Sequence, residues 1–169
     1  MSKNTRFLTH AAVIAALYAV LTHLQNVLLP GSTTWAIQMR LSEALCVLSF
    51  FTPAAIPGLT VGCLVFNITY AAALPLDFLV GSLATLLAAG GMWLTRRVTV
   101  KGYPLLGMAM PALFNALLVG WELTVYIGGV FFLNALYVAL GELAVLLTFG
   151  TVLFYAVKKR HLDTKVFGA

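Results

Sequence analysis

The chain has 169 residues, of which 62% are hydrophobic and only 9% are charged, with a formal net charge of +5. Soluble domains carry about 25% charged residues, so this composition excludes an ordinary soluble protein and indicates an integral membrane protein. The length of 169 residues leaves room for roughly six spans of about 20 residues. We therefore expect a single all-α bundle of six transmembrane helices over residues 1–169.

The apolar segments predict one helix over residues 8–29, ended by Pro30 and Gly31, and then a short apolar stretch over 39–52. The first segment is too long for a signal peptide, so we keep it as a helix. Further helices are predicted over residues 55–73, 76–95, 104–122 and 129–157.

The basic residues predict the orientation of these spans. If the N-terminus is cytoplasmic, only Arg40 of the 10 Lys and Arg residues falls away from the cytoplasmic side. Both termini would then be cytoplasmic, as the positive-inside rule requires. Binding of nucleic acid is the weaker interpretation, because the charges lie at helix ends without interleaved aromatic residues. The other basic residues are Lys3, Arg6, Arg96, Arg97, Lys101, Lys158, Lys159, Arg160 and Lys165.

The stretch over residues 39–52 would cover about 21 Å as an α-helix, which is too short to cross a bilayer core of about 30 Å. We therefore expect residues 30–38 to dip into the extracellular half as a lid loop, with Trp35 and Gln38 over a substrate. Arg40 and Glu43 would line the cavity from one side, or would simply neutralise each other across one helical turn.

Three more carboxylates fall in or near the outer half of the spans, and they are the main candidates for substrate binding. Glu142 lies about 24 Å along its helix from Lys158, and an unpaired carboxylate at that depth usually faces a polar cavity or a partner. Asp77 and Glu122 fall near the outer rim, where a helix cap and a solvated carboxylate are the alternatives. The amides predicted to line the same cavity are Asn67, Asn115 and Asn134.

The sequence has no HExxH or GxSxG motif and no metal-spaced cluster of Cys or His, so we expect neither enzyme activity nor a bound metal or cofactor. Cys46 and Cys63 lie in apolar segments and are interpreted as packing groups. A GxxxxGK[ST] motif is also absent. Any ATP used for transport would therefore be hydrolysed by partner subunits.

Small residues on the first predicted helix form two ladders, in which helical spacing places residues four apart on one face. Such a face allows a helix of another subunit to approach closely, and internal packing is the alternative. The residues of this predicted docking surface are Ala11, Ala15 and Ala19 in one ladder and Ala12 and Ala16 in the other.

These features resemble the substrate-binding S component of an energy-coupling factor (ECF) transporter. More narrowly, the chain resembles the QueT family in IQMRLSEAL at 37–45, GLTVGCLVFN at 58–67, LDFLVGSLATLLAA at 76–89, PALFNALLVGWEL at 111–123 and the Gly141-Glu142 pair. The resemblance implies uptake of a queuosine precursor, a 7-deazaguanine such as preQ1, across the bacterial cell membrane. It also implies a transmembrane coupling subunit and two ATPase subunits as partners.

The candidate residues suit such a substrate. One carboxylate can accept the adjacent N–H and NH₂ of a guanine-like edge, and an aminomethyl cation favours a second carboxylate. Three or four carboxylates against Arg40 alone favour a neutral or cationic substrate. The alternatives are a stand-alone secondary transporter, for which the spans show no clear inverted repeat or broken half-helices, and a structural membrane subunit without a ligand.

Overall fold

The computed structural model describes residues 2–33, 39–70 and 73–167, which form helices and their connections. Within these ranges the only strand-like pairing is an isolated bridge between Val100 and Tyr103. The described stretches that are long and apolar enough to cross a membrane are Lys3–Leu28, Asp77–Thr95, Leu105–Tyr126 and Phe131–Lys159, and two shorter apolar helices are Leu41–Phe50 and Ala55–Thr69. The expectation of an all-α protein with the composition of a membrane bundle is confirmed for the described part of the chain.

The first half of the chain has two long helices with two shorter helices between them. Ser2 caps the first helix, since its Oγ accepts a hydrogen bond from the backbone N–H of Thr5. The second element is a 3₁₀ helix, in contrast to the α-helix expected over residues 39–52. In order, these elements are α1 (Lys3–Leu28), η1 (Leu41–Phe50), α2 (Ala55–Thr69) and α3 (Asp77–Thr95).

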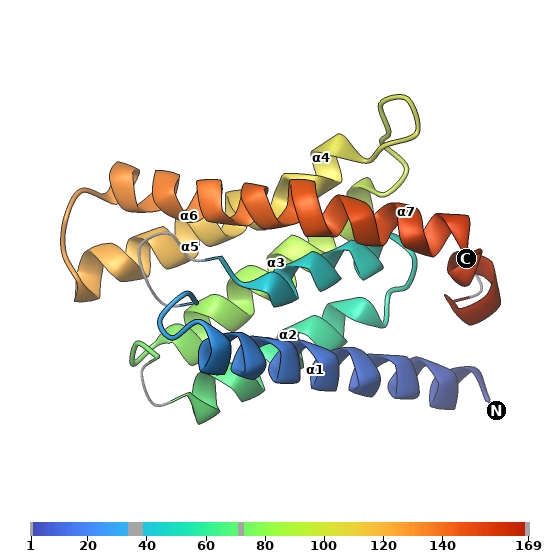
Figure 1. The fold of residues 1–169 in the computed structure, drawn as a ribbon, viewed down its shortest axis with the longest axis horizontal. Coiled ribbons are helices and arrows are strands. Elements are labelled where there is room, and N and C mark those ends of the chain that lie inside the picture. The colour runs from blue at the N-terminus through green and yellow to red at the C-terminus, as the bar shows by residue number, and fades with distance from the viewer. Residues whose placement is uncertain (1, 34–38, 71–72, 168–169) are drawn as a thin grey trace.

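The second half contains two helical rods. The first is interrupted at Ala109, between the short helix α4 and α5. The second contains a π-helical turn between two α-helices, and Figure 1 shows it as one continuous rod from α6 to α7. The elements are α4 (Leu105–Met108), α5 (Met110–Tyr126), α6 (Phe131–Val145), the π turn η2 (Leu146–Gly150), α7 (Thr151–Lys159) and a final π turn η3 (Asp163–Phe167).

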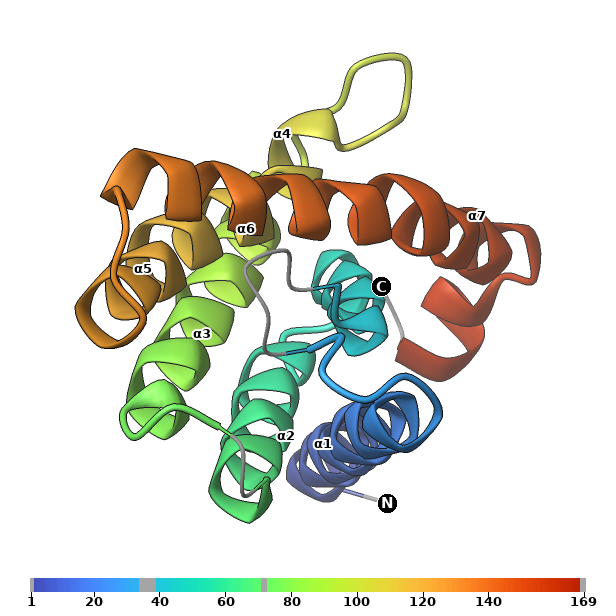
Figure 2. The same ribbon diagram turned by 60° about the vertical axis from the view of Figure 1, so that its left-hand side comes forward.

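The helix η1 lies in the middle of the bundle. It contacts α1, α2, α3, α6, η2 and α7, and Figure 2 shows it enclosed by these helices. Around it, α1 packs on α2, α2 on α3, α3 on α5 and α5 on α6. Figure 1 shows that α1 begins and α7 ends at the same end of the bundle. A short element surrounded by protein can carry polar side chains that would be costly in contact with lipid.

Two glycines allow α1 and α2 to approach closely. A Cβ atom at Gly62 would lie 2.7 Å from the carbonyl oxygen of Ala15 and 2.7 Å from the Cβ of Tyr18. At Gly58 it would lie 2.7 Å from the carbonyl oxygen of Ala11. The close packing of α1 on α2 therefore requires residues without a Cβ atom at positions 58 and 62. This packing holds Tyr18 against the interior of the bundle.

The predicted and observed bounds differ mainly at helix ends. The helix α1 begins at Lys3 rather than residue 8, because the Ser2 cap starts it early. The helix α2 ends at Thr69 instead of residue 73, and α5 continues to Tyr126, past the predicted end at residue 122. Trp35 and Gln38, in the centre of the predicted lid loop, lie outside the described residues.

Candidate functional site

Arg40, directly before η1, is the centre of a buried polar cluster. Its Nη2 donates to Oδ2 of Asp77 at 3.0 Å, and its Nε donates to the backbone oxygen of Thr33 at 3.1 Å. The guanidinium also lies 5.5 Å from the ring centroid of Phe66 and contacts the sulfur of Cys63 at 3.8 Å. The guanidinium is thus held by groups from the α1–η1 connection, α2 and α3.

Asp77 is the partner of Arg40, so the alternative in which Arg40 and Glu43 form the ion pair is wrong. Asp77 is the first residue of α3, but its side chain makes no capping hydrogen bond. Its backbone oxygen accepts from Nδ2 of Asn67 at 2.8 Å. A Cβ atom at Gly81 would lie 2.7 Å from Oδ1 of Asp77 and 2.9 Å from Nδ2 of Asn67, so a glycine is needed for this arrangement.

Glu43 is bound by two donors from the protein. The hydroxyl of Tyr18 donates to Oε1, and the thiol of Cys46 donates to Oε2 at 3.1 Å. A 3₁₀ helix has three residues per turn, so Glu43, Cys46 and Ser49 lie on one line along η1. All three side chains are buried, and this polar row faces the interior of the bundle rather than lipid.

Glu122 and Glu142 are buried carboxyl groups with unsatisfied oxygens. Glu122 is fully buried, which excludes a solvated position at the rim, and neither of its carboxyl oxygens has a hydrogen-bond partner among the described residues. The same holds for Oε2 of Glu142. Buried polar groups without partners cost on the order of 1–3 kcal/mol each, so these atoms mark a place for hydrogen-bond donors.

The carboxyl groups from four helices act on one another electrostatically. Glu122 interacts with Asp77 and Arg40, whereas Glu142 interacts with Glu43 and Arg40. The ion pair between Arg40 and Asp77 is the only one within residues 2–33, 39–70 and 73–167. The charges of the cluster are therefore dominated by carboxyl groups, which favours a ligand that brings donors or positive charge.

The buried amides of this region add unsatisfied groups of both kinds. Oδ1 of Asn67 and Nδ2 of Asn115 have no hydrogen-bond partner in the described part of the chain. Oδ1 of Asp77 also has none there. Asn115 and Glu122 are both buried on α5, as their shared face predicts. We refer to Arg40, the four buried carboxyl groups and the two buried amides as the acidic cluster. Its residues are Arg40, Glu43, Asn67, Asp77, Asn115, Glu122 and Glu142.

Asn134 lies apart from the acidic cluster. Its Nδ2 donates to Oγ1 of Thr124 at 3.0 Å and to the backbone oxygen of Gly128 at 3.0 Å. These bonds hold the connection between α5 and α6, where Gly128 has a positive φ of 93°. The structure therefore gives Asn134 a role in this turn.

Five contact residues of the cluster are absent from the sequence prediction: Tyr18, Thr33, Cys46, Cys63 and Phe66. Tyr18 carries the clearest signal that the sequence offers. It lies within an apolar span instead of at its end, where a tyrosine hydroxyl needs a buried partner. The cysteines carry no such signal, because a thiol in an apolar segment is usually a packing group.

The two alanine ladders on α1 differ in exposure. Ala11 and Ala15 are half-buried against the glycines of α2, whereas Ala12 and Ala16 are exposed. Ala19 is buried, with 8% of its surface exposed, so it does not contribute to an outer surface. We therefore restrict the predicted docking surface to the other four alanines. Three of them, Ala11, Ala12 and Ala15, line an apolar groove of about 270 Å³ between α1 and α2.

No group of three or more His, Cys, Asp and Glu side chains with the arrangement of a metal site occurs in the described ranges. Among curated proteins and among solved structures, none matches the chain. The family model described as QueT transporter matches residues 8–159. The matched region contains the whole acidic cluster and all of the helices from η1 to α7. The chain therefore belongs to the QueT transporter family, a family of transporters and not of enzymes.

Proposed function

We propose that the protein is the substrate-binding S component of an ECF transporter and that it takes up a queuosine precursor, a 7-deazaguanine such as preQ1. The observation that supports this proposal most strongly is the set of unsatisfied buried oxygens in the acidic cluster, on Asn67, Asp77, Glu122 and Glu142. A ligand with several N–H donors and a positive charge would satisfy them.

The geometry suggests a division of roles between the carboxyl groups. Both oxygens of Glu122 lack partners, so this carboxylate is best suited to accept the adjacent N–H and NH₂ of a guanine-like edge. Glu142, with its unsatisfied Oε2, would take the aminomethyl cation. Asn67 offers an acceptor and Asn115 a donor for the remaining ring atoms. Glu43 and Arg40, which already have partners, would hold the wall of the pocket.

The membrane arrangement in this proposal is a single domain of six spans in the bacterial plasma membrane, with both termini cytoplasmic. The acidic cluster would then open toward the extracellular side, under the loop between α1 and η1. The described part of that loop is anchored at Thr33, whose hydroxyl donates to Oδ1 of Asn26 at 2.9 Å and whose backbone oxygen accepts from Arg40. Ordering of this loop would exclude water from the polar contacts beneath it.

The proposed partners are a transmembrane coupling subunit and two ATPase subunits. The sequence lacks a phosphate-binding GxxxxGK[ST] motif, so the energy for uptake would come from these subunits. The coupling subunit would dock on Ala11, Ala12, Ala15 and Ala16 of α1 and on the apolar groove beside them.

Calorimetric titration of the purified full-length chain tests the substrate. We expect preQ1 to bind more tightly than 7-deazaguanine without its aminomethyl group, by about tenfold or more, because one charge-assisted hydrogen bond is lost. An anionic vitamin such as riboflavin phosphate is the control and should not bind. Absence of binding by any deazapurine would contradict the substrate, and uptake into vesicles without ATPase subunits, driven by a proton gradient, would contradict the ECF mechanism.

A further inference from the structure

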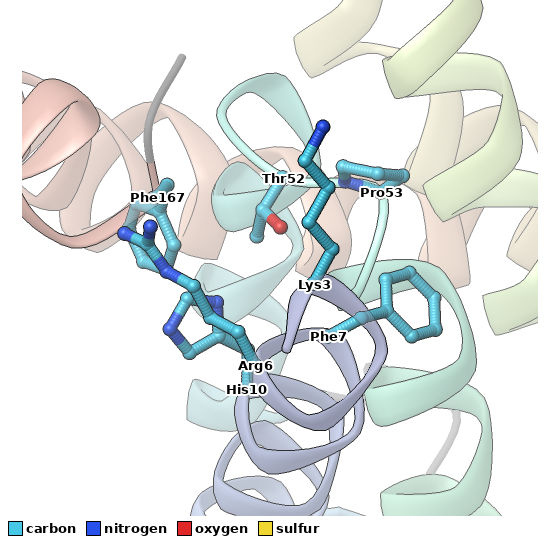
Figure 3. A pocket seen from close by; sticks show the side chains of 7 residues that line it. All are labelled: Lys3, Arg6, Phe7, His10, Thr52, Pro53 and Phe167. Atoms are coloured by element: carbon cyan, nitrogen blue, oxygen red, sulfur yellow. The ribbon is translucent and has the colours of Figure 1, made fainter. Parts of the chain in front are cut away.

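A cavity lies at the end of the bundle where α1 begins, far from the acidic cluster. Its volume is about 300 Å³, and it is lined by the first turns of α1, the η1–α2 connection and the end of η3. Figure 3 shows Lys3 extending past Thr52, while Arg6 reaches toward Phe167. Two basic side chains thus line one cavity.

The cavity has the chemistry of a phosphate site. Neither Lys3 nor Arg6 has a carboxylate partner among the described residues. Arg6 donates to the backbone oxygen of Val166, which fixes its guanidinium at the cavity. Thr52 is buried, and its Oγ1 accepts from the backbone N–H of Ala54, so the hydroxyl hydrogen remains for a second acceptor. A phosphate accepts from all three kinds of donor.

A second, apolar cavity of about 170 Å³ adjoins the first, because His10 and Phe167 line both. It continues along α1 past Val13 to Leu17, which are 53% and 46% exposed and therefore reach the lipid-facing surface. Leu17 lies about 10 Å beyond His10 along the helix, within the half-thickness of about 15 Å of a bilayer core. The apolar cavity therefore lies where an acyl chain would run from a headgroup at Lys3 and Arg6.

We propose that the two cavities together bind one anionic phospholipid, with its phosphate between Lys3, Arg6 and Thr52 and part of an acyl chain beside Val13 and Leu17. A free phosphate would use only the first cavity. A zwitterionic lipid would bring an ammonium group to a site that is already cationic. The bound lipid would hold η3 and the η1–α2 connection against the start of α1. The proposal depends on a location in a membrane and not on the identity of the transported substrate.

The test uses the full-length chain in detergent, titrated with phosphatidylglycerol or phosphatidylcholine, with bound lipid counted by native mass spectrometry. We expect one tightly held phosphatidylglycerol and no comparable phosphatidylcholine. The double variant Lys3→Gln/Arg6→Gln should bind phosphatidylglycerol about tenfold more weakly than Arg97→Gln/Lys101→Gln, which removes the same charge from an exposed connection. Equal binding by the two double variants would overturn the proposal.

Two further variants guard against a folding defect. Lys3→Gln alone keeps the bond between Arg6 and Val166 and should still weaken phosphatidylglycerol binding. Leu17→Trp leaves the basic cavity intact, fills the apolar one and should also reduce retention of the lipid. Glycerol phosphate, which has no acyl chain, should neither bind nor displace the lipid at millimolar concentration. If it competes effectively, or if Leu17→Trp has no effect, the site takes soluble anions and the proposal is wrong.

Discussion

Arg40 shows how a buried charge is distributed among several partners at the scale of single residues. The sequence predicts Glu43 as its neighbour, because residues three apart face the same side of a helix. The structure instead pairs Arg40 with Asp77, 37 residues away, and gives Glu43 to Tyr18 and Cys46. Spacing rules identify neighbours on one helix, whereas the contacts of this cluster come from helices that only the fold brings together.

The pairing of Arg40 predicts a specific pattern of rescue. Arg40→Met should lower the free energy of unfolding by about 3–5 kcal/mol, because Asp77 is left buried without a counter-charge. Adding Asp77→Asn should restore a large part of the loss. Adding Glu43→Gln to Arg40→Met, the matched control, should not restore the lost stability. Denaturant titration in mixed micelles measures all three, and rescue by Glu43→Gln instead would contradict the observed pairing.

The unsatisfied carboxyl groups predict effects on binding with little effect on folding. Glu122→Gln and Glu142→Gln should each weaken binding of preQ1 by roughly tenfold to a hundredfold, the range for a hydrogen bond to a charged group. Asp163→Asn, at the start of the π turn η3, is the control and should bind like the unmodified protein. Unchanged affinity in both Glu variants, measured by calorimetry, would remove them from the site.

At the scale of elements, the sequence predicts the positions and order of the apolar helices well, because lipid-facing residues must be apolar along the whole span. It predicts the type of the central element less well. An apolar run of ten residues such as η1 has no periodicity that separates a 3₁₀ helix from an α-helix when nearly all of its side chains are buried. The polar row of Glu43, Cys46 and Ser49 follows from that helix type. The sequence therefore does not predict that Cys46 donates to Glu43.

The close contact of α1 and α2 predicts that replacing a glycine by alanine lowers the free energy of unfolding at Gly62 and does not lower it at Gly90. Gly62→Ala should destabilise the protein by about 1–3 kcal/mol, because the added Cβ meets backbone and Cβ atoms that cannot rotate away. Gly90→Ala adds the same group where nothing lies within 4 Å. It should be neutral or stabilise α3 by up to about 1 kcal/mol.

The same variant tests the link between this contact and the acidic cluster. Displacement of Tyr18 by the methyl group in Gly62→Ala would remove a donor from Glu43. We therefore expect Gly62→Ala to weaken substrate binding as well as stability, and Gly90→Ala to change neither appreciably. Full affinity in a strongly destabilised Gly62→Ala protein would show that Tyr18 does not depend on this helix contact.

At the scale of the whole molecule, the acidic cluster and the proposed docking surface occupy different parts of the bundle. The acidic cluster is buried in the interior, whereas the proposed docking surface lies on the outside of α1 and α2. Ala12→Trp or Ala16→Trp should therefore abolish uptake by the complete transporter and leave substrate affinity unchanged. Val27→Trp, on an equally exposed part of α1 near its other end, is the control and should transport normally. Loss of substrate binding in the alanine variants would contradict this separation.

The 3₁₀ winding of η1 makes this element longer than an α-helix with the same number of residues. A 3₁₀ helix rises about 2.0 Å per residue and an α-helix about 1.5 Å, so rewinding the ten residues of η1 would shorten it by about 5 Å. Phe50 and Phe51, at its far end, pack against Phe154 of α7 with ring centroids 5.9 Å and 5.5 Å apart. A change of winding that begins near Glu43 would therefore displace Phe50 and Phe51 relative to Phe154.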